Sequence, residues 1–321
     1  MVKDAVTDHD KDAGAGQAEH RAAWLEQRRA METSHQKATP DGPVGHRWWW
    51  VLNLLFSIFE RLLHLTGLYR RGRDNALNIT IKPLSLTLPS LPREFDGYRI
   101  LQISDPHLDL LPELGARMAK LVNGMAVDLL LLTGDYRDRH RDPPDAGLAL
   151  LAPVLDGIQA ADGRYALLGN HDPAAAVPIL ENMGLTVLLN QTITLARAGA
   201  EIHLTGLDDV HSFYTQAAHD ALMEPHQGCR IAAVHSAEVA DYAAQAGFDL
   251  YLCGHTHGGQ ICPPGGRPVM RHLRRCKAYD RGLWRHGGMI GYTSLGAGVA
   301  SMPIRFNCPP EVVLITLHAP E

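Results

Sequence analysis

The stretch YRILQISDPHLD, residues 98–109, determines how the rest of the chain is interpreted. A short apolar run passes into small residues and then into Asp105 and His107, which predicts a buried strand that ends in chemically active side chains. The same order returns in DLLLLTG (128–134), RYALLG (164–169), RIAAV (230–234) and DLYLCG (249–254). Stretches of helical character separate the first three runs, so the sequence predicts an α/β domain. The later runs are richer in β-forming residues, which favours two sheets flanked by helices over one open parallel sheet.

Composition narrows the class of protein. The chain has 321 residues, 45% of them hydrophobic, and a formal net charge of −5. The apolar content excludes disorder throughout, and the charge leaves no global basic field for nucleic acid. Five cysteines without a C-x-x-C pair, and no N-terminal signal sequence, predict a reducing compartment. The 18 histidines point to metal chemistry.

Four parts are expected along the chain. Residues 1–46 mix charged residues with Ala and Gly and are predicted to be a mobile polar tail, with a fraying helix around residues 19–31 left open. Residues 47–73 form an amphipathic, membrane-associated helix, residues 74–92 a linker, and residues 93–321 the globular domain. No function is assigned to the tail.

The helix prediction depends on WWWVLNLLFSIFERLLHLTGLY, residues 48–69. This stretch is long enough to span a bilayer, but its polar residues recur at helical spacing and fall on one face. Glu60 and Arg61 would be costly at the bilayer centre, whereas the tryptophans at one end and the arginines after residue 69 suit a headgroup boundary. An in-plane helix is therefore favoured, while a spanning helix and a helix packed on its own domain remain open.

Five predicted strand ends finish in Asp, Asn or His. In α/β sheets, ligands bind beyond the carboxyl ends of the strands, so these side chains are expected to meet. A single such residue is usually a turn or a hydrogen-bonded core residue, but packing does not explain all five ends together. The candidates are Asp105, His107, Asp135, Asn170, His235, His255 and His257.

The donor types indicate the chemistry. Oxygen and imidazole donors without a thiolate suit Mn, Fe, Zn or Co rather than a structural zinc site. The set is larger than one ion needs, and it fits two ions that share a bridging carboxylate. Such a pair holds a phosphoryl oxygen and activates a water for in-line attack.

These motifs together resemble a known family. The order D-x-H (105–107), G-D-x-x-D (134–138), G-N-H-D (169–172), a later single His and G-H-x-H (254–257) is similar to the signature of the calcineurin-like metallophosphoesterases. The strings LPREFDGYRILQISDPHLD, GHTHGGQI and GVASMPIRFNCPPEVVLITL resemble its bacterial membrane-associated branch. The resemblance covers nearly everything from Leu91 to Leu317, and it implies a four-layer α-β-β-α sandwich.

The resemblance also implies roles for the matching residues. Asp105, His107 and His257 would hold the first metal, and Asn170, His235 and His255 the second, with Asp135 bridging. His171 would donate a proton to the leaving group or stabilise the phosphoryl oxygens. Asp172 would orient that imidazole, and Asp138 would support the site from behind the ligands. His235 is identified mainly by its position after a strand.

The expected activity is hydrolysis of a phosphodiester or pyrophosphate with two divalent ions, Mn first, with Fe, Zn or Co as alternatives. The similar branch includes UDP-2,3-diacylglucosamine hydrolases of lipid A biosynthesis, which implies a lipid-linked substrate. The expected place is an anionic lipid surface on the cytoplasmic face of the bacterial inner membrane, with peripheral or monotopic attachment. A small soluble substrate is the alternative, and a non-catalytic scaffold is disfavoured because the ligand set is intact. No nucleic acid partner is expected, and the oligomeric state stays open.

Two further features each have two interpretations. The segment 263–286 contains seven Lys or Arg residues and one acidic residue. It is interpreted either as a solvated loop or as a basic rim that faces a diphosphate or the bilayer. The residues Leu108, Leu110, Leu111, Leu114 and Met118 are predicted to pack in the core, with an apolar lip for acyl chains as the alternative.

Overall fold

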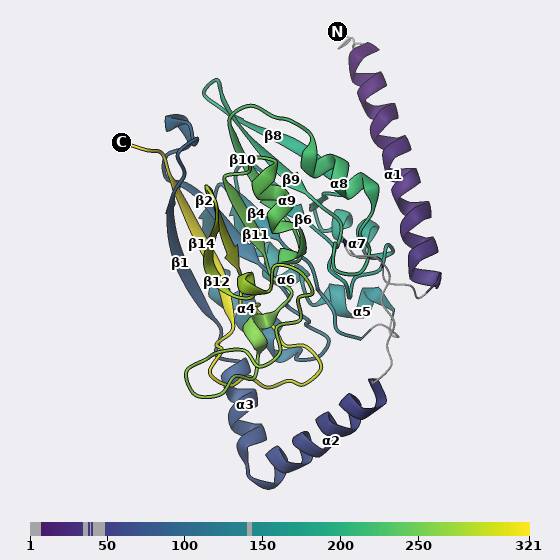
Figure 1. Ribbon diagram of the computed structural model, residues 1–321, viewed down its shortest axis with the longest axis vertical. Helices are drawn as coiled ribbons and strands as arrows, with labels where there is room; N and C mark the ends of the chain where they lie inside the picture. The colour runs from purple at the N-terminus through teal and green to yellow at the C-terminus, as the bar shows by residue number, and fades with distance from the viewer. Residues whose placement is uncertain (1–7, 35–37, 39, 41–48, 140–142) are drawn as a thin grey trace.

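Two β-sheets lie against each other in the computed structural model, which describes residues 8–34, 38, 40, 49–139 and 143–321. The first sheet has the order β1-β14-β2-β4-β6-β7, and the second β12-β13-β11-β10-β9-β8 (Figure 1). The first consists of β1 (Thr80–Thr87), β14 (Glu311–His318), β2 (Tyr98–Ile103), β4 (Leu129–Leu132), β6 (Arg164–Ala166) and β7 (Thr186–Val187). The second consists of β12 (Gly282–His286), β13 (Met289–Thr293), β11 (Leu250–Cys253), β10 (Cys229–Ala233), β9 (Ala200–Gly206) and β8 (Gln191–Arg197).

Each sheet is parallel around the strands that carry the motifs. Strands β2, β4, β6 and β7 run parallel, as do β13, β11, β10 and β9. Antiparallel partners join at β14–β2, β8–β9 and β12–β13. A small parallel pair is formed by β3 (Met125–Val127) and β5 (Ile158–Ala160). The predicted two-sheet α/β fold is confirmed.

Helices cover the outer faces of both sheets. One apolar core lies between the first sheet and α4 (Glu113–Val122), α5 (Pro144–Ala149), α6 (Ala152–Asp156) and α7 (Ala176–Asn182). Another lies between the second sheet and α8 (Gln216–Met223) and α9 (Ala240–Gln245), and a third fills the space between the sheets. Short 3-10 turns are η1 (Arg93–Phe95), η2 (Ala237–Val239), η3 (His257–Gly259) and η4 (Lys277–Tyr279). The layers therefore follow the predicted order α-β-β-α.

Strand β4 shows why the apolar runs are continuous. Leu129 and Leu131 face the core between the sheets, whereas Leu130 and Leu132 face the core under the helices. Successive side chains of a strand point to opposite faces, so a strand buried on both sides must be apolar throughout. The leucines after the first motif also lie in the core, with Leu108, Leu111, Leu114 and Met118 all fully or almost fully buried. The predicted core packing is thus confirmed, and the acyl-chain lip was wrong.

The N-terminal segment differs from the predicted mobile tail. The helix α1 (Asp8–Ser34) runs along the molecule beside α7 and α8 (Figure 1). Trp24 is 6% exposed and Arg28 1% exposed, because both are held by polar groups of the domain. Leu25 and Trp24 pack on the core beneath the first sheet. The tail prediction was therefore wrong for residues 8–34, and most of residues 35–46 lie outside the described part.

The predicted linker 74–92 also contains regular structure. Strand β1 pairs in parallel with β14 from Thr80↔Glu311 to Thr87↔His318 and forms the edge of the first sheet. The domain therefore begins before Arg93. Alternation of Leu84, Leu86 and Leu88 was visible in the sequence, and Leu86 and Leu88 are buried between the sheets.

Two helices precede β1 and project from one end of the molecule (Figure 1). They are α2 (Trp49–Leu65) and α3 (Leu68–Ala76). Within the described residues, no helix combines the length and apolarity that crossing a membrane requires. Leu63 of α2 packs against Met302 and Ile304, while other large apolar side chains of α2 are exposed.

Candidate metal centre

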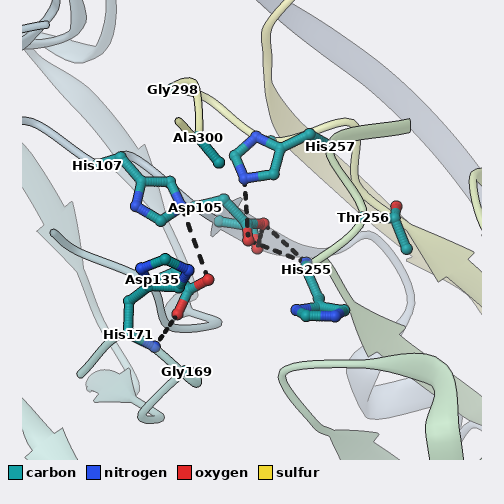
Figure 2. Close-up of polar contacts among 12 residues, drawn as sticks. Asp105, His107, Asp135, Gly169, His171, His255, Thr256, His257, Gly298 and Ala300 are labelled. Carbon is teal, nitrogen blue, oxygen red and sulfur yellow. Dashed lines mark hydrogen bonds and ion pairs between the residues drawn. The ribbon is translucent and has the colours of Figure 1, made fainter. Parts of the chain in front are cut away.

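The predicted candidates meet where the parallel strands of both sheets end. Asp105 and His107 follow β2, Asp135 follows β4, and Asn170 follows β6 by a short loop. From the second sheet, His235 follows β10, and His255 and His257 follow β11. Figure 2 shows the side chains of Asp105, His107, Asp135, His255 and His257 converging on a common space. Two sheets thus contribute to one site.

One cluster contains Asp135, Asn170, His235 and His255. Nε2 of His235 lies 3.3 Å from Oδ2 of Asp135, 3.2 Å from Oδ1 of Asn170 and 3.2 Å from Nδ1 of His255. Backbone carbonyls fix both rings, since Nδ1–H of His235 donates to Thr133 O at 2.7 Å and Nε2–H of His255 donates to His272 O at 3.0 Å. In these tautomers the other ring nitrogens turn their lone pairs toward each other and toward the carboxylate.

A second cluster contains Asp105, His107 and His257, whose donor atoms lie within 4.8 Å of one another. Nε2 of His257 is 3.8 Å from Oδ1 of Asp105. Nε2 of His257 and both ring nitrogens of His107 are buried without a hydrogen-bond partner. Buried polar atoms are nearly always satisfied, so these nitrogens indicate a group that they would hold. Ser104 Oγ and the amide of His255 hold the Asp105 carboxylate in place.

Asp135 stands between the two clusters. Its Oδ2 lies 3.6 Å from Nε2 of His107 and 3.3 Å from Nε2 of His235. The backbone amide of His171 donates to its other oxygen, Oδ1, at 2.9 Å (Figure 2). This carboxylate therefore faces both clusters, as a bridging ligand must.

The donor set fits two divalent ions. Mixed carboxylate, amide and imidazole donors suit Mn, Fe, Zn or Co. Burial lowers the pKa of His255 and His257 well below the usual value, and neighbouring positive groups lower it further. Neutral imidazole is the form that binds metal.

The two central carboxyl groups differ in their pKa. Burial raises the pKa of Asp105 to about 6. Burial acts in the same direction on Asp135, but His235, His171 and His107 outweigh it and hold the pKa of Asp135 well below its usual value. Asp135 is thus held as a carboxylate beside the imidazoles.

The motif glycines leave room for the carboxylates. A Cβ on Gly169 would lie 2.1 Å from Oδ1 of Asp135, and one on Gly254 would lie 2.2 Å from Oδ2 of Asp105. A Cβ on Gly134 would lie 2.5 Å from the amide nitrogen of Gly169. These distances are too short for any side chain, which explains why Gly precedes Asp, Asn and His in the three motifs.

The backbone at the site is held in an uncommon conformation. Positive φ is unusual for residues other than Gly and is found at functional sites that the surrounding structure over-determines. Five of the predicted ligands adopt it, with φ between 38° and 73°: Asp105, His107, Asp135, His255 and His257. The sharp turns direct these side chains back over the strand ends.

His171 and Asp172 lie beside the clusters, but not as predicted relative to each other. Nδ1–H of His171 donates to the carbonyl of Asp138 at 3.0 Å. The Asp172 carboxylate accepts the backbone amides of Asp135 at 2.7 Å, Tyr136 at 3.0 Å and Gly169 at 2.8 Å. The prediction that Asp172 orients the His171 ring therefore needs correction: Asp172 joins two motif loops, because their amides converge on its oxygens.

Sequence reasoning missed Arg305, which is fully buried. Its Nη2 donates to the carbonyls of Leu295 at 2.7 Å, Gly296 at 3.1 Å and Gly298 at 2.6 Å, and it lies 3.3 Å from Nδ1 of His257. It therefore holds the loop 295–298 against a metal-ligand candidate. A lone Arg within MPIRFN carried no signal of burial.

His211 was also missed. Its ring lies 4.2 Å, centroid to centroid, from that of His255, and its Nδ1 lies 2.9 Å from Oε1 of Glu238. Glu238 also accepts the backbone amides of Arg274 and Arg275 at 2.9 and 2.7 Å. Arg274 and Arg275 of the basic segment 263–286 are thus bonded to the buried Glu238. The exposed basic side chains of this segment are Arg267, Arg271, Lys277 and Arg285.

Comparison with known proteins gives a consistent result. Residues 98–259 match the family described as Calcineurin-like phosphoesterase. The chain is 31% identical over 239 residues to the uncharacterized metallophosphoesterase YkuE of Bacillus subtilis, covering 71% of this chain and 82% of the relative. It is 28% identical over 232 residues to the phosphodiesterase YaeI of Escherichia coli, covering 68% of this chain and 82% of the relative.

Proposed function

The chain belongs to the calcineurin-like phosphoesterase family, and on that premise we propose that it is a two-metal phosphodiesterase in which Asp135 bridges the ions. Members of this family are hydrolases that act on phosphoric esters, so the chain is a metallophosphoesterase. The remaining ligands in the proposal are Asp105, His107 and His257 for the first ion, and Asn170, His235 and His255 for the second.

One observation carries the proposal. Two groups of buried donors, Asp105–His107–His257 and Asp135–His235–His255, lie next to each other, and Oδ2 of Asp135 in the second group is 3.6 Å from Nε2 of His107 in the first. A single-ion site needs only one of these groups. The diester preference is supported by the relative named as a phosphodiesterase, and a site for Mn, Fe, Zn or Co by the mixed oxygen and imidazole donors.

The chemistry supplied by two bound divalent ions is polarisation of a phosphoryl oxygen and a lowered pKa of the attacking water. The chain's own residues would position the ester and handle the leaving group. His171 stands edge-on to His107 at a centroid distance of 5.0 Å, and the Asp138 carbonyl accepts its Nδ1–H. In its imidazolium form, this ring would donate the Nε2 proton to the leaving oxygen.

The test is hydrolysis of bis-p-nitrophenyl phosphate beside p-nitrophenyl phosphate, with added Mn²⁺ and after chelation. Diester cleavage that needs metal and is lost in Asp135→Asn supports the proposal. Preference for the monoester would replace it with a phosphatase. If neither ester is cleaved while Mn²⁺ is demonstrably bound, the two-metal phosphodiesterase is overturned for simple esters, and a non-catalytic scaffold becomes the leading explanation.

We further propose that the substrate is lipid-linked, for example UDP-2,3-diacylglucosamine, and that the enzyme works on the anionic cytoplasmic face of the bacterial inner membrane. The support is an apolar stripe on α2, formed by Leu54, Ile58, Leu62 and Leu65, which are 45–84% exposed. Their spacing of three or four residues puts them on one face of the helix. Arg61 of α2 and Arg70 and Arg71 of α3 are exposed as well, which suits in-plane attachment to anionic lipid.

A further inference from the structure

Arg28 of α1 is a buried cation with partners on two separate loops of the domain. Its Nη1 donates to Oδ1 of Asp208, and its Nη2 donates to the carbonyl oxygen of Asp172 at 2.7 Å. The guanidinium also stacks on the ring of Phe213, 3.5 Å from the centroid, and its Nε donates to Glu32 at 3.0 Å. The partners Asp208 and Asp172 are separated from Arg28 by 180 and 144 positions in the sequence.

Neighbouring residues of α1 strengthen both contacts. Trp24 Nε1 donates to the other oxygen of Asp208 at 2.8 Å. Glu32, one turn after Arg28, accepts the backbone amide of Ala174 at 2.8 Å. One face of the helix, residues 24–32, is therefore bonded to the loops 172–174 and 208–213 together.

Both loops contribute to the half of the site around the second ion. Asp172 closes the G-N-H-D motif and joins it, through its carboxylate, to the amide of Asp135. The loop after Asp208 carries His211, whose ring packs on that of His255. Contacts of α1 thus reach the ligand loops on both sides of the second cluster, although α1 lies outside the residues that match the family.

The energetics favour a positioning role over a purely stabilising one. Burying a charged pair costs desolvation free energy that its attraction roughly offsets, so a buried ion pair is weak evidence for stability. Its geometry is nevertheless specific, because a planar guanidinium presents its N–H donors in a fixed fork, whereas the Lys ammonium is a compact charge on a flexible stem.

We propose that α1 is a positioning strap of the catalytic site, and that Arg28 is a positioning residue that fixes the loops of Asn170 and His211 for binding of the second ion. The proposal rests on the two-metal function. Loss of the bridge leaves Asp208 buried with one donor fewer and frees the Asp172 carbonyl. The second-ion ligands then lose their fixed spacing, while the first cluster keeps its own contacts.

The experiment titrates Mn²⁺ into metal-free wild-type protein, Arg28→Lys and Arg21→Lys by calorimetry, with kcat and KM for bis-p-nitrophenyl phosphate measured on the same samples. Arg21 is the matched control, because it lies on α1 and pairs with Glu181 at the surface, where its side chain is 45% exposed. We expect one of two Mn²⁺ equivalents to bind at least about tenfold more weakly in Arg28→Lys, with kcat falling and KM little changed. Arg21→Lys should behave like wild type.

The outcomes distinguish the positioning role of Arg28 from the two-metal function on which it rests. If Arg28→Lys melts at a lower temperature yet binds both equivalents with wild-type affinity, Arg28 is merely structural and the proposal is overturned. If Arg28→Lys does not fold, Trp24→Phe removes one donor to Asp208 while keeping the apolar contact, and it must weaken the same equivalent. Failure of the wild type to bind two equivalents would instead overturn the two-metal function.

Discussion

At the residue scale, the metal site depends on the absence of side chains at its glycines, because a Cβ there would overlap the carboxylate ligands. Gly169→Ala would put a Cβ 2.1 Å from Oδ1 of Asp135 and 2.6 Å from its backbone nitrogen. Because neither backbone nor carboxylate has room to move, we expect Mn²⁺ affinity to fall at least about tenfold. Gly288→Ala is the matched control, since no atom lies within 4 Å of its Cβ position. Equal Mn²⁺ affinity of the two variants in a calorimetric titration would contradict the explanation.

Among the proposed metal ligands, Asp135 is expected to contribute most to kcat. Asp135→Asn removes the negative charge that faces both clusters, whereas the Asp105 carboxylate is a candidate ligand in the first cluster only. We therefore expect kcat for the diester to fall at least about a hundredfold in Asp135→Asn, and by less in Asp105→Asn. The two variants, assayed side by side at saturating Mn²⁺, check the order. The reverse order would argue against Asp135 as the bridge.

The ligand candidates could be predicted because each follows a strand within a few residues. Within each sheet their convergence follows from the rule that parallel strands end at the same edge, and the packing of the two sheets brings the two groups together. Arg28, His211 and Arg305 could not be predicted in this way, because their roles come from partners distant in the sequence. The motif also does not show that the Asp172 carboxylate accepts the backbone amides of Asp135 and Gly169.

At the element scale, the lack of apolar periodicity in α1 led to the prediction of a tail, and the alternation in β1 was assigned to a linker. Polar and small residues dominate α1, and its buried face is formed around Trp24, Leu25 and Arg28. A buried Arg looks like a surface residue in any hydrophobicity pattern, so the helix resembled a solvated tail. β1 had the alternation of a strand, but its pairing with β14 joins segments more than 200 positions apart.

The helix α2 makes a prediction that needs no knowledge of the substrate. Leu62→Asn should lower binding to vesicles of phosphatidylglycerol at least about tenfold, because one buried leucine contributes roughly 1.5–3 kcal/mol. Leu283→Asn on β12 is the matched control, since Leu62 and Leu283 are both 54% exposed. Vesicle co-sedimentation measures both, and hydrolysis of the soluble diester should be unchanged. If the two variants bind vesicles as well as wild type does, the stripe is not the lipid contact.

At the scale of the whole molecule, the metal centre joins the two sheets, which also pack on each other through an apolar core. Asp105 and Asp135 come from the first sheet, and His235 and His255 from the second. Hydrogen bonds from α1 and from Arg305 hold loops next to the site. A ligand set divided between sheets is present in full only in the folded chain. Ion binding is therefore linked to global unfolding rather than to one loop.

We expect Mn²⁺ at about a hundred times its Kd to stabilise the fold by about 2.7 kcal/mol and to raise Tm by roughly 5 °C over the chelated protein. The rise should also depend on pH. In the ion-free fold, burial raises the pKa of Asp105 to about 6, so its proton stabilises that fold at low pH and this contribution is lost as the pH rises through about 6. Mn²⁺ binds the carboxylate, so the rise should be largest near pH 7.5 and shrink toward pH 5. Thermal melts of wild type and Asp135→Asn test this. A rise in Tm that is the same at both pH values, or that Asp135→Asn retains in full, would show that Mn²⁺ stabilises the protein from another site.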